Sequence, residues 1–293
     1  MIHLTGHDDT VRCVAYCPDG TTLASGSEDG TVRLWDLATR QARKVLKAGS
    51  SVESVAISPD GKTVAAGCAG GNIWLWTASG SRAKKPLSGH ADGVRVVLFV
   101  PDDGRMLATA GWDGTAQLWD VSKDTGWALA AAVGVPVMAL ACPRNGAWFA
   151  LGLYDGRLRL CTPHRPKNDA TLQGHDRGIF AMAVSPDGAT LATADAGGTL
   201  KLWDVAARKE RASWQAHDHV IYGLAFTPDG AALASGGADG TVKVWDLGGR
   251  LRGAYQWQQR WVTSLAIAPD GMTAAAGGAD QTVVVWDIDA SSV

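Results

Sequence analysis

The segment Leu4–Asp36, LTGHDDTVRCVAYCPDGTTLASGSEDGTVRLWD, decides the fold because close copies of it follow one another along the chain. Repetition at a fixed period is the signature of solenoids and propellers. The tryptophan near its end recurs after 41, 43, 84, 42 and 41 residues, and Cys161 lies at the midpoint of the double gap. These closing tryptophans are Trp35, Trp76, Trp119, Trp203, Trp245 and Trp286.

A second marker gives the same number of repeats. A proline opens a turn once per period, and five of these seven turns read Pro-Asp-Gly. The prolines are Pro18, Pro59, Pro101, Pro143, Pro186, Pro228 and Pro269. Two independent markers therefore indicate seven repeats, at approximately 4–36, 46–77, 87–120, 131–162, 172–204, 214–246 and 256–287.

Each repeat has the composition of short strands. Val11–Tyr16 and Thr31–Trp35 are rich in β-branched and aromatic residues, and tight-turn residues bound them. A further run, Ala42–Lys47, precedes the next repeat. Four strands per repeat form one antiparallel blade, which cannot bury both faces alone and must pack against neighbours around a ring. The sequence predicts an all-β, seven-bladed β-propeller that occupies residues 1–293 as a single domain.

The chain resembles the WD-repeat (WD40) family of propellers over essentially its whole length. Gly-His opens three repeats, at Gly6-His7, Gly89-His90 and Gly174-His175, and Ala216-His217 is a close variant. Trp-Asp closes five repeats, the first at Trp35-Asp36. Only seven residues follow Trp286, so the last blade lacks an outer strand of its own. The family's overlapped closure implies that the N-terminal segment Met1–Thr5 supplies it.

The resemblance also implies a buried structural tetrad of His, Ser or Thr, Asp and Trp in each repeat. By spacing, only the first repeat is complete, with His7, Ser27, Asp29 and Trp35. A Ser-His-Asp nucleophile is the competing interpretation, but it needs an exposed serine and an oxyanion site. The other repeats keep His90, Asp113 and Trp119; His175 and Trp203; His217, Asp239 and Trp245; and Asp280 and Trp286. Gly111 and Gly237 fill the hydroxyl position of the third and sixth repeats, and Gly197 the carboxylate position of the fifth.

Three positions per repeat point toward one mouth of the channel in the family. Mixed charge falls on the first three blades, and one aromatic residue falls on each of blades three to seven. The charged residues are Arg12, Glu28, Glu53 and Arg95, and the aromatic ones are Trp112, Tyr154, Phe180, Tyr222 and Trp261. In the fourth repeat the alignment gives Val135 and Val137 beside Tyr154. Trp, Tyr and Arg are enriched in binding hot spots. Packing between blades is the alternative role for each aromatic residue.

Charge and cysteine content indicate which partners, metals and compartments to expect. A net charge of -2 offers no basic excess for nucleic acid, and no apolar stretch approaches a membrane span. The N-terminus lacks the regions of a signal peptide. Five cysteines, an odd number, argue against a disulfide framework, and no ligand spacing indicates zinc. We therefore expect a monomeric domain with reduced thiols in the cytoplasm, without a metal or cofactor.

The expected function is that of a non-catalytic scaffold or recognition module that binds a protein or peptide at one mouth of the channel. An aromatic cage for methylated lysine is one version of this function. A phosphopeptide reader is disfavoured, because Arg12 and Arg95 are separated by a blade that carries Glu53. A sensor or regulatory domain of a larger signalling protein remains an alternative. An enzyme is less favoured, because the mouth positions hold only Glu28 and Glu53 as acids and no histidine.

Overall fold

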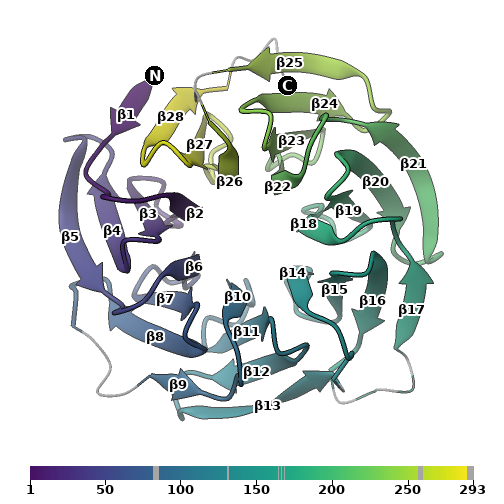
Figure 1. Ribbon diagram of the computed structural model, residues 1–293, viewed down its shortest axis with the longest axis horizontal. Coiled ribbons are helices and arrows are strands. Elements are labelled where there is room, and N and C mark those ends of the chain that lie inside the picture. The colour runs from purple at the N-terminus through teal and green to yellow at the C-terminus, as the bar shows by residue number, and fades with distance from the viewer. Residues whose placement is uncertain are drawn as a thin grey trace.

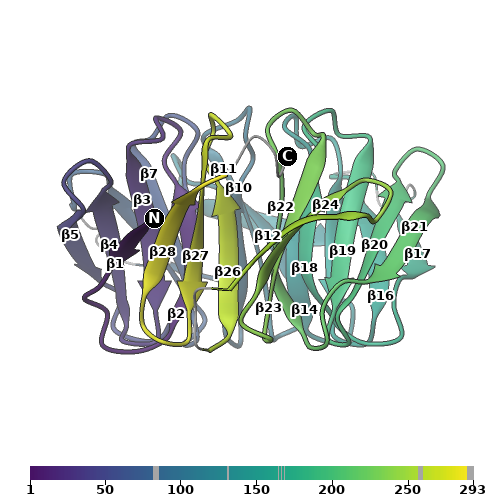
Figure 2. The ribbon, with the colours of Figure 1, turned by 90° about the horizontal axis from the view of Figure 1, so that it is seen from above.

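The computed structural model shows seven four-stranded antiparallel sheets arranged as blades around a central channel (Figure 1). The predicted seven-bladed β-propeller is confirmed. Seen from the side, the strands run between two faces of the ring, so the turns gather on those faces (Figure 2). The structure describes residues 1–81, 86–130, 132–163, 165, 167, 169–256 and 260–288.

The strands follow the chain from the inner to the outer edge of each blade. Blades one to three contain β2 (Val11–Tyr16), β3 (Thr22–Ser27), β4 (Thr31–Asp36), β5 (Gln41–Lys47); β6 (Val52–Ile57), β7 (Thr63–Cys68), β8 (Asn72–Thr77), β9 (Leu87–Ser88); and β10 (Val94–Phe99), β11 (Met106–Gly111), β12 (Ala116–Asp120), β13 (Thr125–Ala130). Blades four to six contain β14 (Val137–Ala141), β15 (Phe149–Leu153), β16 (Arg157–Cys161), β17 (Ala170–Gln173); β18 (Ile179–Val184), β19 (Thr190–Asp195), β20 (Thr199–Asp204), β21 (Lys209–Gln215); and β22 (Ile221–Phe226), β23 (Ala232–Gly237), β24 (Val242–Asp246), β25 (Leu251–Tyr255). Blade seven contains β26 (Val262–Ile267), β27 (Thr273–Gly278), β28 (Val283–Asp287) and, at its outer edge, β1 (Ile2–Leu4).

The N-terminal strand closes the ring, as the sequence predicts. β1 pairs antiparallel with β28, and Leu4 lies opposite Val283 (Figure 1). Leu4 is 1% exposed and belongs to a core cluster that contains Val283 of blade seven and Val11 and Trp35 of blade one. The same strand therefore covers the open edge of β28 and joins the two ends of the chain.

In five of the seven blades, a glycine on the second strand meets the next blade so closely that there is no room for a side chain, and Ala110 and Ala194 take its place in the other two. A Cβ atom on Gly26 of β3 would lie 2.5 Å from Cγ1 of Val52 in the next blade. A Cβ atom on Gly67 would likewise lie 2.7 Å from Cγ1 of Val94. Across the closure, a Cβ atom on Gly277 would lie 2.8 Å from Cγ1 of Val11. Glycine on the second strand thus admits the β-branched residue that opens the adjacent inner strand, and the closing interface has the geometry of the others.

Removal of residues 1–6 should lower the melting temperature sharply, because β28 would lose its outer partner and the core would lose Leu4. Leu4→Ala alone should cost about 2–5 kcal/mol of unfolding free energy, the usual range for truncating a buried leucine. His3→Ala is the matched control, since His3 is exposed on the same strand. Thermal melts monitored by circular dichroism would measure these changes. A truncated chain that melts like the intact one would contradict the closure.

Candidate functional site

A β-bulge occurs at the second residue of every inner strand. The pairing of inner and second strands shifts register at this residue in all seven blades. A bulge locally breaks the ladder and re-aims a side chain. The bulged residues all line the cavity in the central channel, and we call them the channel ring: Arg12, Glu53, Arg95, Met138, Phe180, Tyr222 and Thr263.

A backbone hydrogen bond clamps the mouth above the channel ring in each blade. The N–H of the residue after the second strand donates to the carbonyl of the residue just before the inner strand, as Glu28 does to Thr10 at 3.0 Å. The other pairs are Ala69 with Ser51, Trp112 with Gly93, Tyr154 with Pro136, Ala196 with Gly178, Ala238 with Val220 and Ala279 with Trp261. We call the face that carries these pairs the clamp face. The face that carries the Pro-Asp-Gly turns is the turn face.

The fourth blade corrects the alignment made from the sequence. Pro136 and Met138 occupy the two mouth positions of β14, whereas Val135 and Val137 were expected there. Val137 is fully buried and takes the core position that Val11 has in the first blade. Proline fits the first position because the residue there only accepts the clamp hydrogen bond, so no N–H is needed.

Four of the five predicted aromatic residues form a continuous row. Ring centroids are separated by 6.5 Å from Trp112 to Tyr154, 6.3 Å from Tyr154 to Phe180 and 6.0 Å from Phe180 to Tyr222. The last two contacts are edge-to-face, which is a favoured geometry for aromatic pairs. Trp112 and Tyr154 are 42% and 54% exposed, while Phe180 and Tyr222 are half-buried. We call these four residues the aromatic row.

Trp261 lies apart from the aromatic row. It is 54% exposed and lines a separate hollow of about 580 Å³ between blades six and seven, together with Thr10, Gln256 and Arg260. The predicted arc of five aromatic residues is therefore divided into a row of four and one isolated tryptophan. The division depends on how the loops lie in space, which residue spacing does not reveal.

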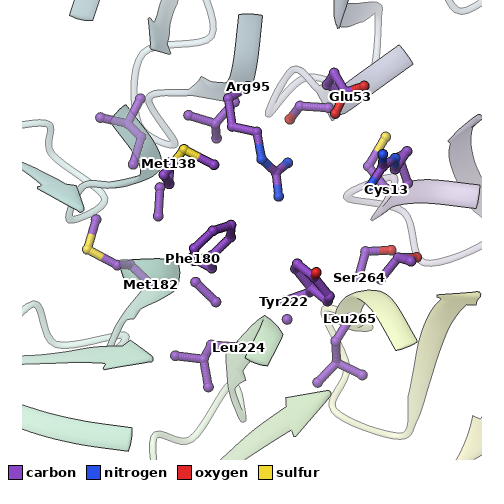
Figure 3. A pocket seen from close by; sticks show the side chains of 18 residues that line it. Cys13, Glu53, Arg95, Met138, Phe180, Met182, Tyr222, Leu224, Ser264 and Leu265 are labelled. Carbon is purple, nitrogen blue, oxygen red and sulfur yellow. The ribbon is translucent and has the colours of Figure 1, made fainter. Parts of the chain in front are cut away.

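The channel cavity has a volume of about 200 Å³ and unequal walls (Figure 3). Three of the predicted charged residues line it, Arg12, Glu53 and Arg95. Arg12 Nη2 lies 2.5 Å from Glu28 Oε1, and the Ser51 hydroxyl donates to Glu53 Oε1 at 3.0 Å. Arg95 forms no hydrogen bond or ion pair within the described part of the chain. Burial lowers the pKa of Arg95, and the nearby Glu53 carboxylate acts in the opposite direction.

The tetrad of the first blade uses Ser25, and the choice of Ser27 from spacing is wrong. Trp35 Nε1 donates to Ser25 Oγ at 2.8 Å, and Ser25 Oγ lies 2.7 Å from His7 Nε2. His7 Nδ1 lies 2.8 Å from Asp29 Oδ2. Ser27 instead donates to the carbonyl of Asp9. The two serines are two residues apart on β3, so their side chains point to the same face of the sheet. Only Ser25 lies level with the indole of Trp35.

Three further blades have complete tetrads, which the sequence analysis missed. In all four cases the indole and the hydroxyl are ten residues apart, a spacing that could have identified the correct serine or threonine. The additional sets are His90, Thr109, Asp113 and Trp119; His175, Thr193, Asp195 and Trp203; and His217, Ser235, Asp239 and Trp245. In the seventh blade, Asp280 accepts a hydrogen bond from Thr282, and Trp286 is buried.

The fifth blade places its carboxylate two residues earlier than the others do. Gly197 occupies the usual aspartate position, and Asp195 Oδ2 lies 3.1 Å from His175 Nδ1. Thr193 takes the hydroxyl position of this tetrad. Asp195 also accepts the backbone N–H groups of Gly197 and Thr199, so it caps the turn as well as holding the imidazole. The carboxylate has thus moved along the chain without loss of its contact.

The tetrad geometry fits a neutral imidazole. His7 donates from Nδ1 to Asp29 and accepts the Ser25 hydroxyl proton at Nε2, so each buried polar group has a partner. Burial lowers the pKa of His7 and of His90. Burial by itself raises the pKa of Asp29, but hydrogen bonds from Thr31 and His7 outweigh it and lower that pKa overall. Ser25 is buried and already bonded on both sides, so the arrangement is structural rather than nucleophilic.

Blades held by such tetrads and closed by the first strand define a WD-repeat propeller. The model of the WD domain, G-beta repeat, matches residues 1–36, and that of the IFT122 first beta-propeller matches residues 43–287. The chain therefore belongs to the WD-repeat β-propeller family represented by the IFT122 first β-propeller. The resemblance seen in the sequence is confirmed.

Several curated proteins are similar to parts of the chain. Nuclear distribution protein nudF of Emericella nidulans is 34% identical over 180 residues, 59% of this chain and 40% of that protein. Ribosome biogenesis protein BOP1 of Rattus norvegicus is 49% identical over 49 residues, 17% of this chain and 7% of its own. Notchless protein homolog of Arabidopsis thaliana is 61% identical over 36 residues, 12% and 8% of the two chains. The matched part spans at most about two fifths of these relatives.

The described residues add two observations on membranes and metals. Across these residues, no helix is long and apolar enough to span a membrane. Over the same part of the chain, no three His, Cys, Asp or Glu side chains are grouped so as to hold a metal ion. All five cysteines are free, and burial raises the pKa of Cys142 and of Cys161 to about 12.

Ser25→Ala should destabilise the protein by about 1–3 kcal/mol, because it leaves the Trp35 indole N–H and His7 Nε2 unpaired in a buried site. Ser27→Ala, the matched control two residues away, removes a hydroxyl that the aligned positions Gly111 and Gly237 lack, so its cost should be smaller. Urea denaturation would compare the two free energies of unfolding. A larger loss from Ser27→Ala would contradict the assignment of the tetrad.

Proposed function

We propose that this propeller is a non-catalytic scaffold or recognition module that binds a protein or peptide at the clamp-face mouth of its channel. The observation that carries this proposal is the aromatic row. It begins at the exposed Trp112, passes Tyr154 and ends at Phe180 and Tyr222 inside the channel. An extended segment could lie along it and send one side chain into the cavity.

The exposure of these rings supports binding over packing between blades. Trp112 and Tyr154 keep about half of their surface open, whereas an aromatic residue that only filled space between blades would be buried. Together with Trp261, they are the large aromatic residues that stand exposed in the described part of the chain, and all three lie on the clamp face. Apolar surface gathered in one place typically marks an interaction site.

Rigidity also supports this role. The aromatic row rests on the clamp hydrogen bonds, and its rings contact one another before any partner arrives. Gly93 leaves space for Trp112, since a Cβ atom there would lie 3.1 Å from Trp112 Cδ1. Preorganised side chains lose little conformational entropy on binding. The surface is therefore rich in Trp and Tyr, as binding hot spots are, and its side chains are already fixed in position.

The proposal also includes a non-catalytic role, a cytoplasmic location and a monomeric state. The two mouth carboxylates already have partners, Glu28 in Arg12 and Glu53 in Ser51, which favours a binding role over acid–base chemistry. Membership of the WD-repeat family supports protein binding. A cytoplasmic location and a monomeric state belong to the proposal as well, and the five free, mostly buried cysteines support a reducing compartment.

Selection from a random peptide library displayed on phage tests this function. Peptides that bind the wild-type protein should lose roughly 30-fold or more in affinity for Trp112→Ala and for Tyr154→Ala, as expected for hot-spot aromatic residues. Met272→Ala is the control, because Met272 is also an exposed apolar residue but follows a Pro-Asp-Gly turn on the other face. Isothermal titration calorimetry would give the affinities. Selected peptides that bind both aromatic variants as tightly as the wild type would refute the proposed mouth.

A further inference from the structure

We propose that the ligand residue entering the channel carries a carboxylate, and that Arg95 recognises it. This inference rests on the proposed peptide-binding function and names the chemistry that the mouth selects. It follows from the position of Arg95, from the pairing of the other charged groups around it, and from the shape and charge of the cavity.

Arg95 is aimed at the space a ligand would fill. It is the bulged residue of β10, and its guanidinium points into the middle of the channel cavity, between Glu53 and Phe180 (Figure 3). The fork of a guanidinium matches a planar carboxylate and can donate two parallel hydrogen bonds to it. The bulge fixes the backbone from which the side chain extends, so the donor group is presented by a strand rather than by a loop.

Among the described residues Arg95 has no direct hydrogen-bond or ion-pair partner, and Glu53 acts on it only through space. Arg12 is paired with Glu28, and Glu53 accepts the Ser51 hydroxyl. No carboxylate among the described residues lies within ion-pair distance of Arg95. A half-buried charge without a direct partner is poorly solvated, and an incoming carboxylate would supply both the countercharge and the acceptors. Arg12 Nε, on the same wall, also lacks an acceptor. The Ser264 hydroxyl, which also lines the cavity, has no hydrogen-bond partner among the described residues either, so three side chains there hold unused donors.

The cavity favours a carboxylate over a phosphate group. Arg12 and Glu28 compensate each other, so Arg95 and Glu53 are the charges that remain at the cavity, and a ligand with one negative charge fits better there than one with two. A phosphate dianion calls for clustered arginines, whereas Glu53 lies between Arg12 and Arg95 around the ring and repels a second negative charge. Met138, beside Arg95, and Phe180 and Tyr222, farther around the ring, offer apolar contact to the methylene groups of an acidic side chain (Figure 3). The volume of about 200 Å³ admits a single side chain or a chain end.

Two peptide libraries distinguish the sources of this carboxylate. One library displays random peptides with a free C-terminus, and the other holds them between two fused segments, so that only Asp or Glu side chains can supply the group. The expected result is that the selected peptides contain a required acid. Replacing it with Asn or Gln, or amidating the C-terminus, should weaken binding roughly 10- to 100-fold, the range for a charge-assisted hydrogen bond.

A double-mutant cycle assigns that loss to Arg95. Arg95→Gln should weaken binding of the acidic peptide by the same factor, and the amide peptide should then bind wild type and variant alike. Arg95→Lys keeps the positive charge but lacks the two parallel donors of the guanidinium, so its affinity for the acidic peptide should lie between those of the wild type and Arg95→Gln. Arg144→Gln is the control, because Arg144 lies at the turn-face mouth and is exposed. If Arg95→Gln does not fold, Arg95→Lys, which keeps the positive charge, takes its place in the same cycle.

The outcomes separate this inference from the function on which it rests. Peptides that require Trp112 but bind without any acid, or ignore Arg95→Gln, would overturn the carboxylate and leave the proposed function standing. Peptides that bind independently of Trp112 and Tyr154 would remove the proposed function itself. An acid that is required, with Arg95→Gln and the amide peptide showing equal and non-additive losses, would establish the inference.

Discussion

The structure depends on the close contact between a small residue of one blade and the β-branched residue that opens the inner strand of the next. The small residue is glycine in five blades and alanine, Ala110 and Ala194, in the other two. A blade of four strands has two apolar faces and can bury them only against its neighbours. Where Gly26 faces Val52, or Gly277 faces Val11, the backbones approach so closely that a Cβ atom would collide. Because the contact between the last blade and the first is the same as the contacts inside the ring, seven blades close without a special interface. β1 then covers the one strand edge that remains.

Packing and chemistry are separated within each inner strand. Its first residue, such as Val11 or Val262, is buried and belongs to the core. Its second residue is displaced from the ladder by the bulge and faces the channel. The core therefore restricts the first position, while the second is free to be Arg, Glu, Met, Phe, Tyr or Thr. The tetrads reinforce this division. They stabilise four of the blades, and their buried polar groups are already hydrogen-bonded to one another. A rigid scaffold thus presents a variable ring of side chains.

The sequence predicts the scaffold well because its markers are local and repeated. Seven prolines and six tryptophans establish the period. Errors arose where two equivalent residues compete. Ser25 and Ser27 share one orientation on β3, and only the depth of the Trp35 indole selects between them. In the fourth blade the alignment was wrong by one residue. Pro136 accepts the clamp hydrogen bond there, and its lack of an N–H gave no sign of that role in the sequence. The isolation of Trp261 and the unpaired state of Arg95 depend on distances around the ring, which no pattern along the chain reports.

The most direct test of the clamp-face mouth is to map a bound peptide by nuclear magnetic resonance, using the indole N–H signals of the tryptophans and the backbone amides. The account predicts that a selected peptide shifts the Trp112 indole signal and the amides of the aromatic row, and leaves the Pro-Asp-Gly turns unchanged. Shifts centred on the turn face, with the Trp112 signal unmoved, would contradict the account.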